Sequence, residues 1–206
     1  MSSSPSPRKR PGREFDSTGH TQAEWDNPTP SVVPSDRSHG RSMSAELVVA
    51  ECDVGRGVFA SRAFRTGERI LTFVGDSYHR SHPMHDTPQG ANLLQVGREL
   101  YILPEPVGLF VNHSCNPNAG LRGTRTLVAI RDIAEGEEIR FDYSTNMDED
   151  LWTMACACHE PGCRGLIGDF KHLPESVRAR YITLGIVPRF IVERYGANGK
   201  NGNGHA

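Results

Sequence analysis

The sequence predicts a mainly β, α+β domain with short peripheral helices and a disordered N-terminal arm. Three observations support this fold class. Short segments rich in β-branched or aromatic residues recur between glycines, a clear helical pattern occurs only near the C-terminal end, and the first 44 residues carry few aliphatic side chains. With 206 residues, 36% of them hydrophobic, the chain is expected to form one core with tails.

Short strands make up most of the predicted core. Each candidate is bounded by glycine, proline, asparagine or charged turn residues, which is the pattern of a strand rather than of a buried helix. The predicted strands are residues 46–51, 58–61, 69–74, 93–96, 101–103, 126–130 and 138–141.

The best helix candidate covers residues 174–184. It has proline in its first turn, Val177 and Tyr181 at helical spacing, and Gly185 just beyond its end. A second short helix is predicted over residues 147–154.

Residues 77–90 form an insert between strands, with His79, His82 and His85 at three-residue spacing. Histidines at this spacing can bind a metal, but no cysteine or carboxylate cluster accompanies them. A mobile polar loop is the favoured interpretation.

Both ends of the chain are predicted to be disordered tails, residues 1–44 and 196–206, because their composition buries too little apolar surface to offset the entropy of ordering. The basic run at residues 8–13 is expected to be a solvated charge cluster, with a nuclear signal or a contact for an acidic partner as the alternatives.

Charge and hydropathy narrow the classes of function. A net charge of −2 disfavours direct nucleic-acid binding, and no apolar run approaches the length of a membrane span. Five cysteines are an odd number for a disulfide scaffold, and Cys52 stands alone beside a strand as an expected core residue. An intracellular, reducing location, cytoplasmic or nuclear, is therefore expected.

Residues 109–118 join an apolar run to a dense polar cluster. Asn112 and His113 are followed by a serine, a cysteine and the segment 116–118, Asn-Pro-Asn, which predicts a turn. The amide and imidazole are therefore expected on a folded loop that a ligand can reach.

Three cysteines have the spacing of metal ligands. Cys156, Cys158 and Cys163 form Cys-x-Cys-x4-Cys, and a structural zinc site requires four thiolate or imidazole ligands. Either Cys115 or His159 could complete the set, and three buried thiols without a metal are the alternative.

Two further motifs are weak signals when taken singly. Residues 55–57, Gly-Arg-Gly, lack the third glycine and the following helix of a dinucleotide site, so a turn at which the backbone approaches a ligand is predicted, with a plain hairpin as the alternative. Residues 141–143, Phe-Asp-Tyr, end a predicted strand, where a tyrosine is more often packing than catalytic.

Together these motifs resemble the SET domain of protein lysine methyltransferases, including the cysteine-containing segment that follows it. The resemblance covers about residues 46–168 in order, and it rests on residues 55–60, 112–118, 137–143 and the segment 156–165.

The resemblance implies a β-clip architecture of small sheets in which the segment after Asn112 forms a pseudoknot. It also implies a SET domain at residues 45–145, a post-SET zinc-binding segment at 146–168 and a C-terminal helical extension at 169–195.

The resemblance further implies S-adenosyl-L-methionine as methyl donor and structural zinc. Its implied site residues are Tyr143 at the reaction centre; Gly55, Arg56, Gly57, Asn112, His113 and Leu166 at the donor; Phe141, Phe73 and Trp152 at the substrate channel; and Cys115, Cys156, Cys158 and Cys163 at the zinc ion.

The implied reaction is methyl transfer to lysine in a protein or peptide, possibly a histone. Phe141 stands where the family carries either phenylalanine or tyrosine, and phenylalanine there implies di- or trimethylation, because no hydroxyl anchors the amine. The alternatives are a degenerate domain that serves as a protein-binding module and a methyltransferase of a free amino acid or small amine.

Several positions depart from the family pattern. Residues 73–76 read Phe-Val-Gly-Asp where Tyr-x-Gly-Glu is frequent, so a second active-site hydroxyl is missing, and Leu109 stands where an arginine is common. The insert at 77–90 is short and no cysteine-rich segment precedes the domain.

Overall fold

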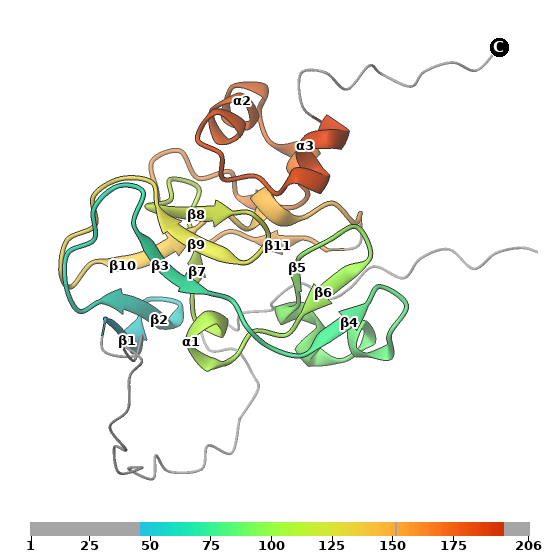
Figure 1. The fold of residues 1–206 in the computed structure, drawn as a ribbon, viewed down its shortest axis with the longest axis horizontal. Coiled ribbons are helices and arrows are strands. Elements are labelled where there is room, and N and C mark those ends of the chain that lie inside the picture. Colours follow the sequence, from blue (N-terminus) through green and yellow to red (C-terminus); the bar gives the residue numbers. More distant parts are fainter. Residues whose placement is uncertain (1–45, 151, 196–206) are drawn as a thin grey trace, which may run out of the picture.

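The structure is a computed structural model that describes residues 46–150 and 152–195, so both predicted tails, 1–44 and 196–206, lie outside the described residues. Within the described part, short strands form four small sheets, and helices are few and short (Figure 1). The mainly β prediction is confirmed.

The largest sheet has the strand order β1-β2-β10-β7. Strands β1 (Leu47–Cys52) and β2 (Gly55–Ala60) form an antiparallel hairpin, and β10 (Glu138–Phe141) pairs with β2. Strand β7 (Asn112–His113) lies parallel to β10, with Asn112 opposite Arg140. Parallel pairing of these distant segments is the contact that the expected pseudoknot requires.

The remaining sheets are smaller and antiparallel. Their strand orders are β3-β9-β8, β4-β6-β5 and β11-β12. The bounds are β3 Arg69–Thr72, β4 Ser77–His79, β5 Leu94–Gln95, β6 Leu100–Ile102, β8 Ala119–Arg122, β9 Thr126–Ala129, β11 Met154–Ala155 and β12 Leu166–Ile167.

Three clusters of buried apolar residues hold these sheets together. The main cluster contains one fully buried residue from each of four strands: Val58, Ile70, Leu127 and Ile139. Alternate residues of a strand face the same side, so each strand can turn one face toward this cluster. A second cluster lies under the C-terminal helices, and a third joins Met147, Trp152, Met154 and Ile167.

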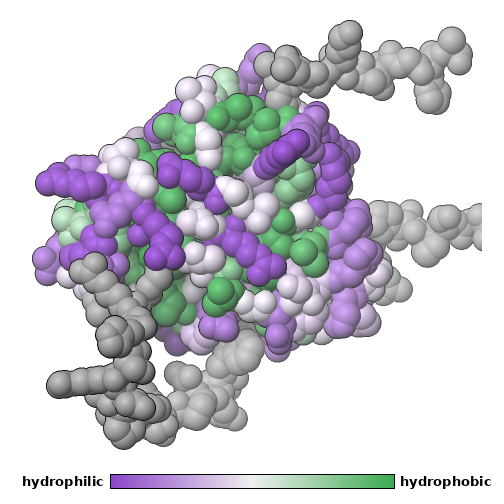
Figure 2. All heavy atoms as spheres, in the orientation of Figure 1, coloured by the Kyte–Doolittle hydropathy of each residue, from purple (hydrophilic) through white to green (hydrophobic). Residues whose placement is uncertain are grey.

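Helices α2 (Glu175–Thr183) and α3 (Arg189–Tyr195) lie together at one end of the molecule, beside β8 and β9 (Figure 1). Helix α2 confirms the predicted helix within one residue at each end. Helix α1 is a single turn, Pro106–Leu109, that precedes β7. On the face shown in Figure 2, polar residues separate the hydrophobic ones into patches.

The helix predicted over residues 147–154 is wrong. A 3-10 turn, Tyr143–Asn146, ends before it, and the next backbone N–H groups bind side chains instead of helix carbonyls. Asp148 N–H donates to Gln95 Oε1 at 2.8 Å, and Glu149 N–H donates to Asp169 Oδ2 at 3.1 Å. These bonds satisfy the donors that a helix would have used.

Two loop predictions are also corrected. Residues 55–57 belong to strand β2, and the turn of the hairpin falls at residues 53–54. Residues 77–90 contain strand β4 and a 3-10 turn, Pro83–Asp86, followed by a second, Pro88–Asn92. His85 is buried with its ring centroid 4.5 Å from that of Tyr101, so this insert is folded.

Gly120 lies on strand β8, where the sheet β3-β9-β8 contacts the C-terminal extension. A Cβ at this position would lie 2.7 Å from Cβ and Cγ2 of the fully buried Ile186. We expect Gly120→Ala to lower the free energy of unfolding by about 1–3 kcal/mol, because the buried backbone must shift. Urea unfolding measures the change, and Gly162→Ala is the control, since its Cβ meets nothing within 4 Å. Equal stability of the two variants would contradict the prediction.

Candidate active site

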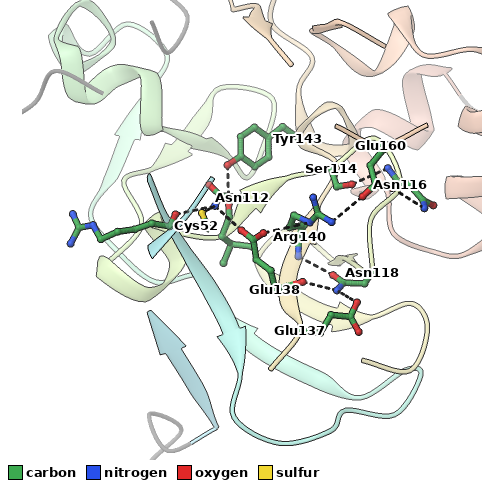
Figure 3. Close-up of polar contacts among 12 residues, drawn as sticks. Cys52, Asn112, Ser114, Asn116, Asn118, Glu137, Glu138, Arg140, Tyr143 and Glu160 are labelled. Atoms are coloured by element: carbon green, nitrogen blue, oxygen red, sulfur yellow. Dashed lines mark hydrogen bonds and ion pairs between the residues drawn. The ribbon is translucent and has the colours of Figure 1, made fainter. Parts of the chain in front are cut away.

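Asn112 anchors the junction of three strands. Its Nδ2 donates to the Arg56 carbonyl at 2.9 Å and to Glu138 Oε1 at 2.8 Å, and lies 3.5 Å from Cys52 Sγ (Figure 3). These contacts tie β7 to the hairpin and to β10 at once. A buried amide with this many partners is held in one orientation.

Gly57 allows this junction to form. A Cβ there would lie 3.1 Å from the Glu138 carboxyl carbon and 3.2 Å from Asn112 Nδ2, so only glycine fits without displacement. The neighbouring Arg56 side chain stacks its guanidinium 3.9 Å from the centroid of the Phe110 ring.

A second set of contacts fixes strand β10 from the other side. Asn118 donates to the Glu138 carbonyl and accepts from Arg140 N–H, each at 2.8 Å. Arg140 Nη2 in turn reaches Glu160 Oε1 at 2.9 Å, and Asn116 Nδ2 reaches Glu160 Oε2 at 3.3 Å (Figure 3). The polar segment 112–118 is thereby joined to the cysteine-bearing loop.

Tyr143 is positioned by hydrogen bonds at both ends. Its hydroxyl donates to the Val111 carbonyl at 2.9 Å, and its backbone N–H donates to His113 Nδ1 at 3.2 Å. Its ring lies between those of Phe141 and Trp152, with centroid separations of 5.0 Å and 6.3 Å. Tyr143 is therefore joined to Val111 and His113, which flank Asn112 in the sequence.

Two cavities meet at Tyr143, which lines both. The larger, about 330 Å³, is bordered by polar side chains that include Asn112, His113, Glu138 and Arg140. The smaller, about 50 Å³, is mostly apolar, and its lining residues include Phe73, Leu94, Val111, Phe141 and Trp152. A volume near 330 Å³ is within the range of small-ligand sites, whereas the smaller cavity suits a single extended chain.

Asp142, fully buried, links the tyrosine to the C-terminal part of the chain. Its Oδ1 accepts from Arg164 Nη2 at 2.8 Å and from Ser144 N–H at 3.1 Å, and its Oδ2 accepts from Tyr181 Oη at 3.0 Å. Burial and the adjacent carboxylate raise the pKa of Tyr181, so its hydroxyl stays protonated as the donor. Sequence reasoning gave Tyr181 only a packing role.

We expect Tyr181→Phe to reduce the free energy of unfolding by about 1–3 kcal/mol, because the buried Asp142 carboxylate loses one donor. Chemical denaturation of the whole chain measures the change. Tyr78→Phe is the matched control, since the Tyr78 hydroxyl has no hydrogen bond within the described residues. The prediction is wrong if both variants keep the stability of the parent chain.

Three of the four cysteines expected to bind zinc come together, and His113 joins them. One ligand atom from each of His113, Cys115, Cys156 and Cys158 lies within 4.8 Å of the others, and the sulfurs of Cys115 and Cys156 are 3.7 Å apart. Cys163 lies at the edge of this group, with its Sγ 4.0 Å from the Cys156 carbonyl oxygen. His159 borders the larger cavity instead of joining the group.

The thiols have unequal acidity. Burial raises the pKa of Cys115 to about 11 and also raises that of Cys156. Burial acts in the same direction on Cys158, but the backbone N–H groups of Cys115 and Glu160 outweigh it and lower the pKa to about 7. Cys158 is therefore the readiest thiolate near neutral pH, and thiolates are the form that binds zinc.

His113 lies between Tyr143 and the cysteine group. Burial lowers its pKa to about 4, so the ring is neutral near pH 7, and its Nδ1 accepts the Tyr143 N–H at 3.2 Å. Its Nε2 lies 3.4 Å from Cys115 Sγ. His113 thereby connects the tyrosine to the cysteine group.

The predicted residues fall into two groups. Asn112, His113 and Tyr143 line the larger cavity, and Phe73, Phe141, Trp152 and Tyr143 line the smaller. The structure does not place the predicted donor residues Gly55, Arg56, Gly57 and Leu166 among those lining the larger cavity, and Leu166 on β12 is 60% exposed. Leu109, one of the departures, lines the smaller cavity.

The site combines three features: small β-sheets, two cavities that share Tyr143, and an adjoining group of cysteines. The family model described as "SET domain" matches residues 55–144 of this chain. Residues 55–144, less than half of the chain, are therefore similar to SET domains.

Curated relatives agree with this assignment. A segment covering 56% of the chain is 30% identical to "Histone-lysine N-methyltransferase ATX2" of Arabidopsis thaliana, and another of the same coverage is 39% identical to "Histone-lysine N-methyltransferase ash1" of Drosophila melanogaster. The matched segments span only 12% and 6% of those proteins.

Among solved structures, a "Humanized mutant of the Chaetomium thermophilum Polycomb Repressive Complex 2" is 19% identical over 50% of this chain and 15% of that chain. Its TM-score of 0.44 is too low to add to the assignment. No helix among residues 46–150 and 152–195 has the length and apolar character needed to cross a bilayer.

Proposed function

We propose that this chain is an S-adenosylmethionine-dependent methyltransferase that acts on the side-chain amine of lysine in a protein or peptide. The observation that carries the proposal is the position of Tyr143, which lines a polar cavity on one side and a narrow aromatic one on the other. Two reactants held in separate cavities that meet at one hydroxyl are arranged for direct group transfer.

The larger cavity fits the methyl donor by the chemistry of its lining. Asn112 and His113 offer amide and imidazole groups for a nucleoside, and the Glu138 carboxylate offers a negative charge near a cationic ligand. Bound there, S-adenosylmethionine would supply a methyl group on a positively charged sulfur that leaves as a neutral thioether. Gly55, Arg56, Gly57 and Leu166 are proposed to complete this site when the donor is bound.

The smaller cavity supplies the conditions for a neutral amine. Lysine has an ordinary pKa of about 10.4, so it must lose a proton before it can act as a nucleophile. The aromatic walls formed by Phe73, Phe141 and Trp152 exclude water, which disfavours the charged form of the amine. The Tyr143 hydroxyl gives its hydrogen to Val111 and presents an acceptor oxygen.

Zinc is proposed to hold the segment 146–168 against this site. The donor set fits, because the thiols of Cys115, Cys156 and Cys158 already converge and Cys163 adjoins them. Cys115 lies two residues after His113, so an ion bound to all four cysteines would clamp the C-terminal segment beside the larger cavity.

Histones are the proposed substrate class, with a nuclear location, because the relatives are named for histone-lysine methylation. Phe141 and Phe73 carry no hydroxyl that would hold the amine in one orientation. We therefore propose that the enzyme adds two or three methyl groups.

The test is to incubate the purified chain with methyl-labelled S-adenosylmethionine and three acceptor pools: core histones, a cell lysate and free lysine. We expect label on protein lysines, with di- or trimethyl-lysine identified by mass spectrometry. Label on free lysine alone would assign a small-amine methyltransferase. Failure to bind the donor would assign a protein-binding module, and monomethyl-lysine as sole product would contradict the proposed product.

A further inference from the structure

Two residues that line the smaller cavity each carry a buried polar atom without a hydrogen-bond partner among the described residues. The atoms are Asn146 Oδ1 and Trp152 Nε1. Asn146 is 1% exposed and Trp152 is 5% exposed. A buried carbonyl oxygen without a donor costs about 1–3 kcal/mol, so its presence in a native site needs an explanation.

The orientation of the Asn146 amide is fixed by its other end. Its Nδ2 donates to the Gln95 carbonyl at 3.1 Å, and a flipped amide would set two oxygens against each other. Gln95 is fully buried and held in turn, because its Oε1 accepts from Asp148 N–H and its Nε2 donates to the Gly97 carbonyl. Oδ1 is thus the atom of Asn146 that is left for a ligand.

The other groups of the cavity differ from Asn146 in what they can bind. Trp152 Nε1 is a donor and cannot accept from an amine or ammonium group. Phe73 and Phe141 have no polar atom. Tyr143 offers an oxygen at the junction with the larger cavity, so Asn146 Oδ1 provides a second acceptor on the wall of the narrow cavity.

We propose that Asn146 Oδ1 accepts a hydrogen bond from the substrate amine nitrogen, and that this contact makes Asn146 a residue that discriminates among methylation states. The identity of the ligand rests on the proposed function, whereas the site itself rests on the unpaired Oδ1 of Asn146. Asn146 is the last residue of the 3-10 turn Tyr143–Asn146, so the same turn carries both acceptors.

The number of N–H groups on the amine sets the discrimination. An unmethylated ammonium group has three, a dimethylated one has a single N–H, and a trimethylated one has none. A neutral amide oxygen binds these groups without the strong preference for the protonated form that a carboxylate would impose. The contact therefore favours amines that still carry an N–H, which are the substrates of each methyl transfer, over the trimethylated product, and it still allows the amine to lose its proton.

The experiment measures binding of two small probes to the full chain by NMR titration. The first is n-butylamine, which is a charged lysine side-chain analogue at neutral pH, and the second is butyltrimethylammonium, which has equal chain length and charge but no N–H. We expect Asn146→Leu to weaken n-butylamine binding about tenfold and to change butyltrimethylammonium binding less than about twofold.

If Asn146 has only a structural role, Asn146→Leu should weaken the binding of both probes equally. That result overturns the proposal, and so does unchanged binding of both probes. Absence of n-butylamine binding to the parent chain overturns it too. If Asn146→Leu does not fold, the parent chain decides between the outcomes, because butyltrimethylammonium binding as tight as n-butylamine binding also overturns the proposal. Binding of both probes without methyl transfer in the labelling assay would retain the site and reject the proposed function.

Discussion

Tyr143→Phe is expected to reduce methyl transfer at least about 100-fold while changing the Kd for S-adenosylmethionine by less than about threefold. The hydroxyl donates to the Val111 carbonyl at 2.9 Å, at the junction of the two cavities, whereas the aromatic ring provides the packing. Phenylalanine keeps the ring against Phe141 and Trp152 and removes only the oxygen that orients the amine.

Single-turnover rates with labelled donor, together with calorimetric titration of the donor, separate these two effects. Tyr78→Phe, which removes a hydroxyl that has no hydrogen bond in the described chain, should keep the parental rate. A Tyr143→Phe enzyme that retains its rate would remove the tyrosine from the reaction centre. Parallel loss of rate and donor affinity would mean that the hydroxyl shapes the larger cavity instead.

Local sequence patterns were sufficient to predict the elements that are determined by their own residues. Strand β1, the second half of β2, strand β10 and helix α2 follow from β-branched periodicity or from a proline start and glycine stop. The plain hairpin at residues 53–57 was only the alternative interpretation. The convergence of the cysteines was predictable as well, because metal ligands are limited by number and spacing.

Elements stabilised by distant partners were not predictable in this way. Strand β8, Ala-Gly-Leu-Arg, has weak β propensity and forms because β9 pairs with it. Residues 148–150 avoid a helix because Gln95 and Asp169 occupy their N–H groups. No local pattern indicates such contacts, since the partners are tens of residues away in the sequence.

The same limit applies within the site. The helical spacing of Tyr181 on α2 predicted that its side chain packs in the core, and the side chain is buried there. Its hydrogen bond to Asp142 joins residues 39 apart and could not be read from either segment. The C-terminal extension is consequently part of the structure that supports Tyr143, because Asp142 precedes that residue directly.

Cys156→Ser is expected to abolish stoichiometric zinc binding and to loosen the segment 146–168. Structural zinc in small protein sites contributes on the order of 10 kcal/mol of binding free energy at neutral pH, so loss of one ligand is not offset by the few backbone contacts of β11 and β12. Because Cys115 follows the Asn112–His113 pair, donor binding should weaken as well.

Metal analysis by plasma mass spectrometry and hydrogen exchange of the purified chain test this expectation. The parent should carry about one zinc ion per chain, and Cys52→Ser, the same chemical change outside the group, should keep it. Cys163→Ser should also lose the ion, because Cys163 is the proposed fourth thiolate ligand and adjoins the other three cysteines. Full retention of zinc by Cys163→Ser, with loss in His113→Asn, would instead make His113 the fourth ligand. A parent chain without zinc would reject the metal site altogether.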